Sequence, residues 1–233
     1  MVAPTKQRVK FQAAIFDLDG TVTDSSLLHW VTFNDVLKPY NIRIEKETWF
    51  HLYEGTGAQH IFEDVLARHG LLDKVDVALL RSRRRDLFTK LAREQLLPVK
   101  GFGQFSDQLR ALKVPSIIAT NGDDQNVLLC LQLLKMEDEP HVTATEAGKV
   151  KPDPAVYALA CKRLKLAPAA CVVFEDSVPG VLAAKRAGCY CVCVLTTTPR
   201  DALEDAGADL VVQDFTKLTP GMFFTTTNRV QHQ

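Results

Sequence analysis

Two carboxylates stand close together at the end of an apolar run near the start of the chain. Asp17 and Asp19 follow residues 13–16 in the segment AAIFDLDG. Side chains two positions apart in an extended segment point the same way, so both carboxylates can address one ligand. Like charges at this point repel one another, so packing does not explain them. We interpret them as groups that act on a phosphate.

Polar residues also follow two later apolar runs, and a lysine lies in the loop KVKPDP. These residues are Thr120, Asn121, Gly122, Lys151, Glu175 and Asp176. In an open α/β sheet, ligands bind beyond the carboxyl ends of the strands. We therefore expect these residues, although distant in the sequence, to converge with Asp17 and Asp19.

The chemistry of this set of residues predicts a metal. Several carboxylates in one place repel one another and raise one another's pKa values. A divalent cation relieves the repulsion, and oxygen ligands without Cys or His suit Mg²⁺. Carboxylates around Mg²⁺ together with one lysine are the groups that handle a phosphate. We therefore predict Mg²⁺ as the cofactor and a phosphorylated small molecule as the substrate.

The elements that must position these residues alternate between apolar runs and helical patterns. Runs that are apolar throughout, rather than at every second residue, predict strands buried on both faces of a parallel sheet. The strands are expected at residues 13–16, 114–119, 171–174, 189–195 and, more weakly, 208–215. Helical patterns lie between them, so we predict an α/β fold with a doubly wound, Rossmann-like parallel sheet.

One long segment breaks this alternation. Residues 25–97 contain successive helical patterns with no convincing strand between them. We therefore predict an all-helical cap domain at residues 25–97, inserted just after the first strand. Residues 1–24 and 98–233 would then form the α/β core domain.

Composition limits the classes of partner. The 28 basic residues balance 28 acidic ones, which gives no electrostatic case for a nucleic-acid partner. No apolar run approaches the roughly 20 residues of a membrane span, and residues 1–12 lack the apolar stretch of a secretory signal. We expect a monomer in the cytoplasm without a membrane or nucleic-acid partner. Residues 1–12 and 225–233 are expected to be loose extensions.

Six cysteines allow two interpretations. Cys189, Cys191 and Cys193 alternate, so they would share one face of a strand. They could form a metal site, but no histidine lies nearby at ligand spacing. We favour small apolar residues of a buried strand, because free cysteine is among the most buried residue types. Reduced cysteines agree with an intracellular protein.

Four motifs, in this order, resemble those of the haloacid dehalogenase superfamily, in the branch with a helical cap inserted after the first strand. The motifs are DLDGTVTDS from Asp17, the pair Thr120 and Asn121, Lys151 in KPDP, and EDSVPG at residues 175–180. The resemblance extends from about residue 11 to residue 215. The pattern is most similar to phosphoglycolate-phosphatase-like and β-phosphoglucomutase-like proteins.

The resemblance implies a role for each residue. Asp17 would be the nucleophile that forms an aspartyl-phosphate. Asp19 would be the general acid and then the base, and its backbone carbonyl would bind Mg²⁺. Asp176 would bind Mg²⁺ directly, with Glu175 beside it as a further ligand. Two residues would hold the phosphoryl oxygens, namely Thr120 and Lys151.

Further expectations concern protonation and substrate binding. Asp19 must hold a proton part of the time, so we expect its acidic neighbours to raise its pKa. Gly20 would let the backbone turn with its N–H groups toward the phosphate. The residues expected to bind substrate are Gly20, His29, Gly55, Asn121 and Gly122.

The resemblance leaves more than one reaction open. The acid at Asp19 favours an oxygen leaving group, and the phosphoryl group could then pass to water in a phosphatase or to a sugar hydroxyl in a phosphomutase. β-Phosphoglucomutase-like proteins carry an arginine in the cap loop for a second phosphate, and Ala58 stands there instead. We therefore predict a phosphatase for a small phosphomonoester, such as a sugar phosphate, phosphoglycolate or a nucleotide. A non-catalytic regulatory or binding protein on the same fold is the alternative of another class.

Two features of the cap are ambiguous. His29 would gate Asp19 or line the pocket, or it would be an ordinary partly buried helical histidine. Arg81, Arg83, Arg84 and Arg85 form a charge run that we read as a solvated face, although one of them could reach an anionic substrate tail.

Overall fold

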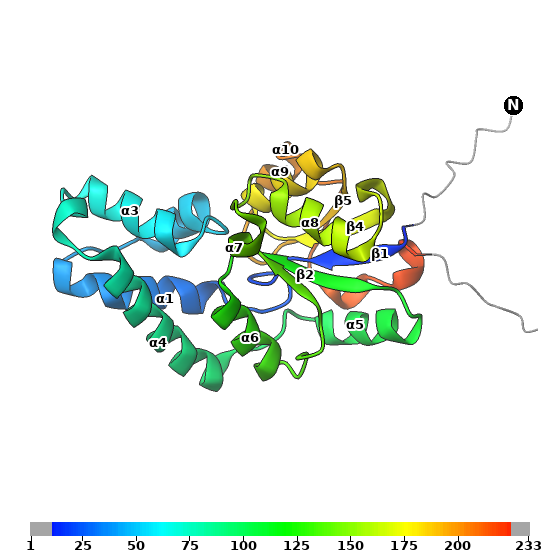
Figure 1. Cartoon of the computed structure of the whole chain (residues 1–233), viewed down its shortest axis with the longest axis horizontal. Helices are drawn as coiled ribbons and strands as arrows, with labels where there is room; N and C mark the ends of the chain where they lie inside the picture. The colour runs from blue at the N-terminus through cyan, green and yellow to red at the C-terminus, as the bar shows by residue number, and fades with distance from the viewer. Residues whose placement is uncertain (1–10, 225–233) are drawn as a thin grey trace, which may run out of the picture.

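The computed structural model describes residues 11–224, and its core is one parallel sheet of six strands. The strands lie in the order β3-β2-β1-β4-β5-β6 (Figure 1). Their bounds are Ala13–Phe16 for β1, Ser116–Thr120 for β2, His141–Thr143 for β3, Cys171–Glu175 for β4, Tyr190–Val194 for β5 and Leu210–Val212 for β6. The predicted α/β class with a doubly wound, Rossmann-like sheet is confirmed. The loose extensions predicted at residues 1–12 and 225–233 lie outside the described residues, except for Phe11 and Gln12. The prediction is wrong for Phe11, which is buried and donates its N–H to the carbonyl oxygen of Phe223 over 2.8 Å.

The order of the strands changes direction at β1. From β1 the chain adds β2 and β3 on one side, and then it returns to add β4, β5 and β6 on the other side. Doubly wound proteins bind ligands beyond the carboxyl ends of the strands at such a switch point. The segments that follow β1 and β4 are therefore where this fold places a site.

Helices cover both faces of the sheet (Figure 1). Successive residues of a strand point to opposite faces, so Phe16 packs with Phe102 and Phe174 on the α5 side, while Ile15 packs on the side of α8 and α9. The core helices are α5 Phe102–Ala111, α6 Asp124–Leu133, α7 Ala144–Ala147, α8 Ala155–Leu164, α9 Val178–Ala187 and α10 Arg200–Asp205.

The predicted all-helical insert lies between β1 and α5. It has its own apolar core, in which Phe33 packs against Trp49 and Phe62 with ring centroids 5.2 and 4.8 Å apart. Its helices are α1 Ser26–Leu37, α2 Lys46–Thr48, a π-helical turn at Trp49–Tyr53, α3 Ala58–Arg68 and α4 Val77–Gln95. The exact domain bounds, 25–97 for the cap, remain a prediction. Short 3₁₀ helices lie at Lys38–Tyr40, Leu72–Lys74, Pro168–Ala170, Phe215–Lys217 and Pro220–Met222.

The chain enters and leaves the cap at neighbouring points. The backbone N–H of Asp24 donates to the carbonyl oxygen of Leu97 over 2.9 Å, and the N–H of Val99 donates to Val22 over 2.9 Å. Thr23 and Pro98 form an antiparallel bridge between these two bonds. The cap is therefore held to the core by two adjacent extended segments.

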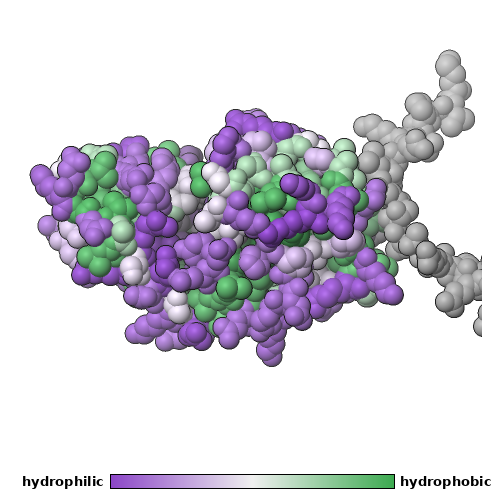
Figure 2. Space-filling model, in the orientation of Figure 1, coloured by the Kyte–Doolittle hydropathy of each residue, from purple (hydrophilic) through white to green (hydrophobic). Residues whose placement is uncertain are grey.

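Hydrophilic residues cover most of the face seen in Figure 2. Within residues 11–224, none of the helices is both long and apolar enough to cross a membrane. All six cysteines are buried and free, which confirms the prediction that they belong to the interior. Cys191 and Cys193 in β5 lie with their sulfurs 3.9 Å apart.

Candidate active site

The pairing of β1 with β4 brings the acidic residues to one place. The strands run parallel with Phe16 opposite Phe174, and the N–H of Asp17 donates to the carbonyl oxygen of Phe174 over 3.0 Å. Asp17 therefore leaves β1 at the level where Glu175 ends β4 and Asp176 begins the next turn. The predicted convergence of these segments at the carboxyl edge of the sheet is found in the structure.

Lys151 connects the two strand ends. Its Nζ donates to Oδ1 of Asp17 over 2.5 Å and to Oε1 of Glu175 over 2.8 Å. Burial acts against the charge of Lys151, but the two carboxylates prevail and raise its pKa. Burial raises the pKa of Asp17 to about 8, against the attraction of Lys151 and with the help of the charge on Glu175. A single ammonium group thus serves two buried carboxylates.

Glu175 is saturated with protein donors. Its Oε1 accepts from Lys151 and from the hydroxyl of Tyr157, and its Oε2 accepts from the N–H groups of Asp176 and Ser177 and from the hydroxyl of Ser177. Burial disfavours its charge, but Lys151 and these hydrogen bonds lower its pKa. Because both oxygens are occupied, the contacts favour a role in holding Lys151 over the predicted role as a metal ligand.

Asp176 lacks a cationic partner within the described residues. Thr21 donates to its Oδ1 over 3.0 Å, and Thr197 donates to its Oδ2 over 2.5 Å. Burial and the charges of Glu175 and Asp17 raise its pKa well above the usual range. Gly20 approaches this carboxylate closely, because a Cβ at Gly20 would lie 2.1 Å from Oδ2.

These contacts fit a divalent cation. Asp17 and Asp176 are buried carboxylates whose pKa values burial raises, and a nearby cation would reverse that shift. In residues 11–224, no three His, Cys, Asp or Glu side chains are arranged to hold a metal ion by themselves. Mg²⁺ does not need such a group, since it is usually bound by one or two carboxylates and keeps several waters. The donor set therefore fits Mg²⁺.

Asp19 is held by residues at the start of the cap. Ser25 donates to Oδ1 of Asp19 over 2.7 Å, and Nε2 of His29 lies 2.8 Å from the same oxygen. Arg84 contacts Nδ1 of His29 over 2.5 Å. An arginine can only donate, so Nδ1 is the acceptor and the ring proton on Nε2 points to Asp19.

This arrangement contradicts the expected pKa of Asp19. Burial acts to raise the pKa, but the positive charge of His29 prevails, together with the hydrogen bonds from His29 and Ser25 and the charge of Arg84, and the pKa is lowered to about 2. The expectation of a raised pKa is therefore wrong for this conformation. The His29 contact with Asp19 agrees with a histidine that gates Asp19. Burial lowers the pKa of His29, although the charge of Asp19 acts to raise it.

The arginine run is not one solvated face. Arg83 is exposed, but Arg84 packs its guanidinium 4.7 Å from the ring centroid of Phe33 and contacts His29. Arg85 turns toward the core, where it pairs with Asp123 over 3.3 Å. The interpretation as a solvated face is therefore wrong for Arg84 and Arg85.

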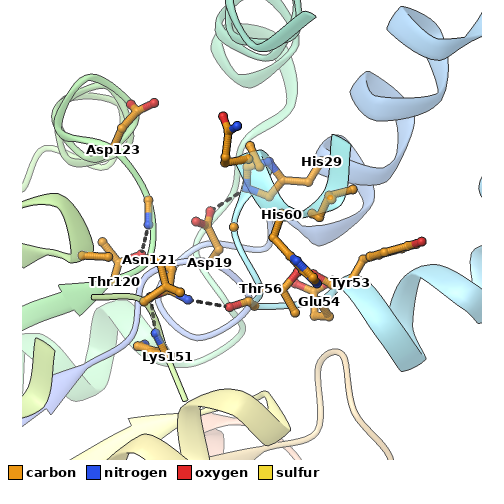
Figure 3. A pocket seen from close by; sticks show the side chains of 18 of the residues that line it. Asp19, His29, Tyr53, Glu54, Thr56, His60, Thr120, Asn121, Asp123 and Lys151 are labelled. Carbon is orange, nitrogen blue, oxygen red and sulfur yellow. Dashed lines mark hydrogen bonds and ion pairs between the residues drawn. The ribbon is translucent and has the colours of Figure 1, made fainter. Parts of the chain in front are cut away.

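Asn121 joins the cap to the core. Its Oδ1 accepts from the N–H of Lys151 over 2.9 Å, and its Nδ2 donates to the carbonyl oxygen of Gly55 over 2.7 Å (Figure 3). Thr120 is buried beside it and accepts from the N–H of Gly122 over 3.0 Å. The cap loop therefore lies closed against the predicted phosphate-binding residues.

A cavity of about 750 Å³ lies between cap and core. Figure 3 draws Asp19 between Thr120 and Asn121 of the core and His60 and Glu54 of the cap. The predicted residues that line the cavity are Asp17, Asp19, His29, Gly55, Thr120, Asn121, Gly122 and Lys151. Gly20, Glu175 and Asp176 do not line it, although a Cβ at Gly20 would clash with Asp176 and Lys151 contacts Glu175.

The sequence analysis missed several residues of the site. Ser25 and Arg84 act on Asp19, Tyr157 supports Glu175, and Glu54 lines the cavity. Glu54 and Ser25 carried a local signal, because Glu54 directly precedes Gly55 of the cap loop and Ser25 ends the motif DLDGTVTDS. The others are brought in by helix packing, which single residue types do not reveal.

Comparisons with known proteins place the chain in a family. Residues 11–188 match the family model of haloacid dehalogenase-like hydrolases. The chain is 30% identical to validoxylamine A 7'-phosphate phosphatase of Streptomyces hygroscopicus subsp. limoneus, over 89% of this chain and 96% of that protein. It is 31% identical to the β-phosphoglucomutase of Bacillus subtilis, over 89% and 92% of the two chains.

Solved structures agree in fold. A hydrolase from Pseudomonas syringae superposes with a TM-score of 0.77 and 26% identity, over 88% of this chain and 94% of that chain. A CbbY variant from Rhodobacter sphaeroides in complex with xylulose-1,5-bisphosphate gives a TM-score of 0.79 at 23% identity, over 92% and 100% of the chains. The predicted resemblance and the prediction of a phosphatase-type enzyme are confirmed. The chain belongs to the family of haloacid dehalogenase-like hydrolases.

Proposed function

We propose that the protein is a Mg²⁺-dependent phosphatase that hydrolyses a small phosphomonoester through a phosphoryl group carried on Asp17. The observation that carries this proposal is the position of Asp17. It lines the cavity at the end of β1, with Lys151 at 2.5 Å, and Asp19 follows it by two residues. A nucleophile, a cation and an acid–base group thus face one space that is large enough for a phosphorylated metabolite.

The residues that would hold Mg²⁺ are Asp17, Asp176 and the backbone carbonyl of Asp19. When bound, the ion supplies positive charge that stabilises the negative charge of the transferring phosphoryl group. Charge from a cation also lowers the pKa of Asp17 from the raised value and keeps its carboxylate ionised.

Lys151 and Thr120 bind the oxygens of the phosphoryl group. Lys151 is fixed by its second hydrogen bond, to Glu175, so its ammonium group is positioned before the substrate arrives. Asp17 then attacks phosphorus, and the bond from phosphorus to the leaving oxygen breaks. Water attacks the phosphorus of the Asp17 ester in the second step and releases phosphate.

Asp19 serves the proton transfers. In the observed conformation it is ionised, which suits the second step, where it takes a proton from the attacking water. As general acid in the first step, Asp19 needs a proton. Two changes favour its protonation. The negative charge of a bound phosphate raises its pKa, and an opening of the cap removes the hydrogen bond from His29.

A phosphomutase is the second candidate. The similarity to β-phosphoglucomutase of Bacillus subtilis favours it. Ala58, at the start of α3, stands where the resemblance predicts an arginine for a second phosphate, so we favour the phosphatase. We also propose a monomer in the cytoplasm. The six free cysteines support that location, because reduced cysteines are typical of intracellular proteins.

Release of inorganic phosphate tests the proposal. We expect the purified chain to hydrolyse p-nitrophenyl phosphate and members of a phosphomonoester panel, with activity lost in EDTA and restored by Mg²⁺. Asp17→Asn should abolish release. A wild type that releases no phosphate from any member of the panel, with Asp17→Asn behaving identically, would contradict the proposal. Conversion of glucose 1-phosphate to glucose 6-phosphate without phosphate release would favour the mutase.

A further inference from the structure

Glu54 is a buried carboxyl group in the cavity that the proposed reaction does not use. It follows the π-helical turn Trp49–Tyr53 and precedes Gly55 of the cap loop. It lines the cavity from the cap side and is only 7% exposed (Figure 3). Burial of an acidic side chain without a partner for its charge destabilises the folded state. A role in ligand binding would explain why the residue is present here.

The two oxygens of Glu54 have different surroundings. Oε2 accepts from the hydroxyl of Ser26 and from the indole N–H of Trp49, the latter over 2.7 Å. Oε1 accepts no hydrogen bond from any residue between 11 and 224. It is also not among the fully enclosed polar atoms that lack a partner, so it remains open to the cavity. One oxygen is thus anchored and the other is available.

The anchor fixes the orientation of the carboxyl group. Ser26 is the first residue of α1, and Trp49 is buried and packed against Phe33. The indole N–H can only donate, so it keeps Oε2 as its acceptor. Oε1 is therefore a preorganised acceptor, which is the condition for a selective contact.

The cations around the cavity are engaged elsewhere. Lys151 serves Asp17 and Glu175, and Lys149 pairs with Asp153 over 3.0 Å. Arg84 contacts His29, and Arg81 donates to Gln59 over 3.1 Å. Within the described residues, Glu54 takes part in no ion pair, so Oε1 is available to a donor group on the substrate.

We infer that Glu54 selects the leaving group of the substrate, by accepting a hydrogen bond from a hydroxyl or ammonium group on it. The inference rests on the proposed phosphatase function and narrows its substrates. It favours phosphomonoesters of polyols, sugars or amino alcohols. When Glu54 is ionised, it disfavours leaving groups that end in a carboxylate or a second phosphate, because like charges would meet in a buried place.

Matched substrates and one matched variant test the inference. The two-carbon series is ethyl phosphate, ethylene glycol monophosphate, phosphoethanolamine and phosphoglycolate, and the six-carbon pair is sorbitol 6-phosphate and 6-phosphogluconate. Glu54→Gln keeps the shape. Its amide oxygen can accept from Trp49 and Ser26, so its NH₂ group faces the cavity as a donor. Glu47→Gln, at an exposed position of α2 that does not line the cavity, removes the same charge and is the control.

In the wild type we expect kcat/KM to be higher for the hydroxyl or ammonium compound than for its carboxylate counterpart in at least one series. In Glu54→Gln this ratio should fall by about tenfold to hundredfold, the range of a hydrogen bond to a charged group. Glu47→Gln should keep the wild-type ratio. Since ratios are compared, a general loss of activity does not imitate the result.

Two results would overturn the inference while leaving the phosphatase intact. One is a wild type that hydrolyses both kinds of substrate with a ratio that Glu54→Gln leaves unchanged. The other is a preference for phosphoglycolate or 6-phosphogluconate that depends on Arg81 rather than on Glu54. Failure of the wild type on every compound would instead overturn the proposed function.

Discussion

The side chain of Asn121 in the core donates a hydrogen bond to the backbone carbonyl of Gly55 in the cap, over 2.7 Å. The same amide accepts from the N–H of Lys151 over 2.9 Å. One side chain is therefore hydrogen-bonded both to the cap loop and to Lys151, the lysine that contacts Asp17. Closure of the cap and assembly of the phosphate site are joined at this residue.

Gly55→Ala should weaken cap closure. Gly55 has φ +74°, and a Cβ there would lie 2.8 Å from Oγ of Ser177 in the core. Gly57→Ala is the control, because Gly57 also has a positive φ but its Cβ would meet nothing within 4 Å. We expect kcat/KM with a phosphomonoester to fall at least about tenfold further in Gly55→Ala than in Gly57→Ala, since misplacement of a closing loop weakens catalysis strongly. Equal losses in both variants would contradict closure through Gly55.

Lys151→Met should remove both activity and stability. It leaves the buried carboxylates of Asp17 and Glu175 without their cation, a change that costs about 3–5 kcal/mol of unfolding free energy. Loss of an electrostatic contact to the transferring group lowers kcat by about 100-fold or more. Urea unfolding and phosphate release measure the two effects.

The control for Lys151→Met is Lys149→Met. Lys149 pairs with Asp153 at the surface, where an ion pair contributes about 0–1 kcal/mol. We expect its unfolding midpoint to stay close to that of the wild type. A Lys151→Met protein as stable as Lys149→Met would show that the buried carboxylates do not depend on the ammonium group.

Gly180→Ala should disturb the site by displacing Glu175. A Cβ at Gly180 would lie 1.7 Å from Oε1 of Glu175, so Glu175 must move and release Lys151. We expect lower thermal stability and a loss of kcat. Gly103→Ala in α5, whose Cβ would meet nothing within 4 Å, should stabilise its helix by about 1 kcal/mol. Similar melting temperatures for the two variants would refute the predicted clash.

Glu54 should make stability depend on pH. Burial raises its pKa from 4.5 to about 7. Because the folded state binds the proton more tightly, this carboxyl group contributes stability below pH 4.5, and the contribution is lost as the pH rises through 7. The loss amounts to at most about 3–4 kcal/mol, from about 1.4 kcal/mol per pKa unit.

Glu54→Gln isolates this contribution. The variant has no proton to lose, so the unfolding free energy of the variant minus that of the wild type should increase from pH 5 to pH 8. Urea unfolding at several pH values measures this difference. A difference that stays constant over this range would mean that Glu54 has an ordinary pKa in the folded protein.

Residue order alone predicted the strands with long apolar runs and their polar ends. β3 at His141–Thr143 was not predicted, because it has three residues and no apolar run. Its place in the sheet comes from pairing with β2, where Ala119 lies opposite Val142. The position of β3 therefore depends on its pairing with a strand that is distant in the sequence, which the local sequence does not reveal.

The site was predictable in position but not in protonation. Successive side chains of an extended segment point in opposite directions. Glu175 and Asp176 are therefore expected to contact different partners, although both are acidic. The low pKa of Asp19 could not be predicted, because it depends on His29 of α1 and on Arg84 of α4. Those two helices meet only in the folded cap, where Arg84 stacks on Phe88 and Phe33.

The junction between cap and core would allow the cap to be exchanged as one inserted domain. Its ends are already bonded to each other, Asp24 to Leu97, as they would be in the closing pair of a hairpin. A short turn could therefore stand in for the whole insert without stretching the sheet, and helices of another size could be grafted at the same two points. Such exchange would give new lids, and so new choices of substrate, to the same core, provided that each lid supplied its own contact to Asp19 in place of His29.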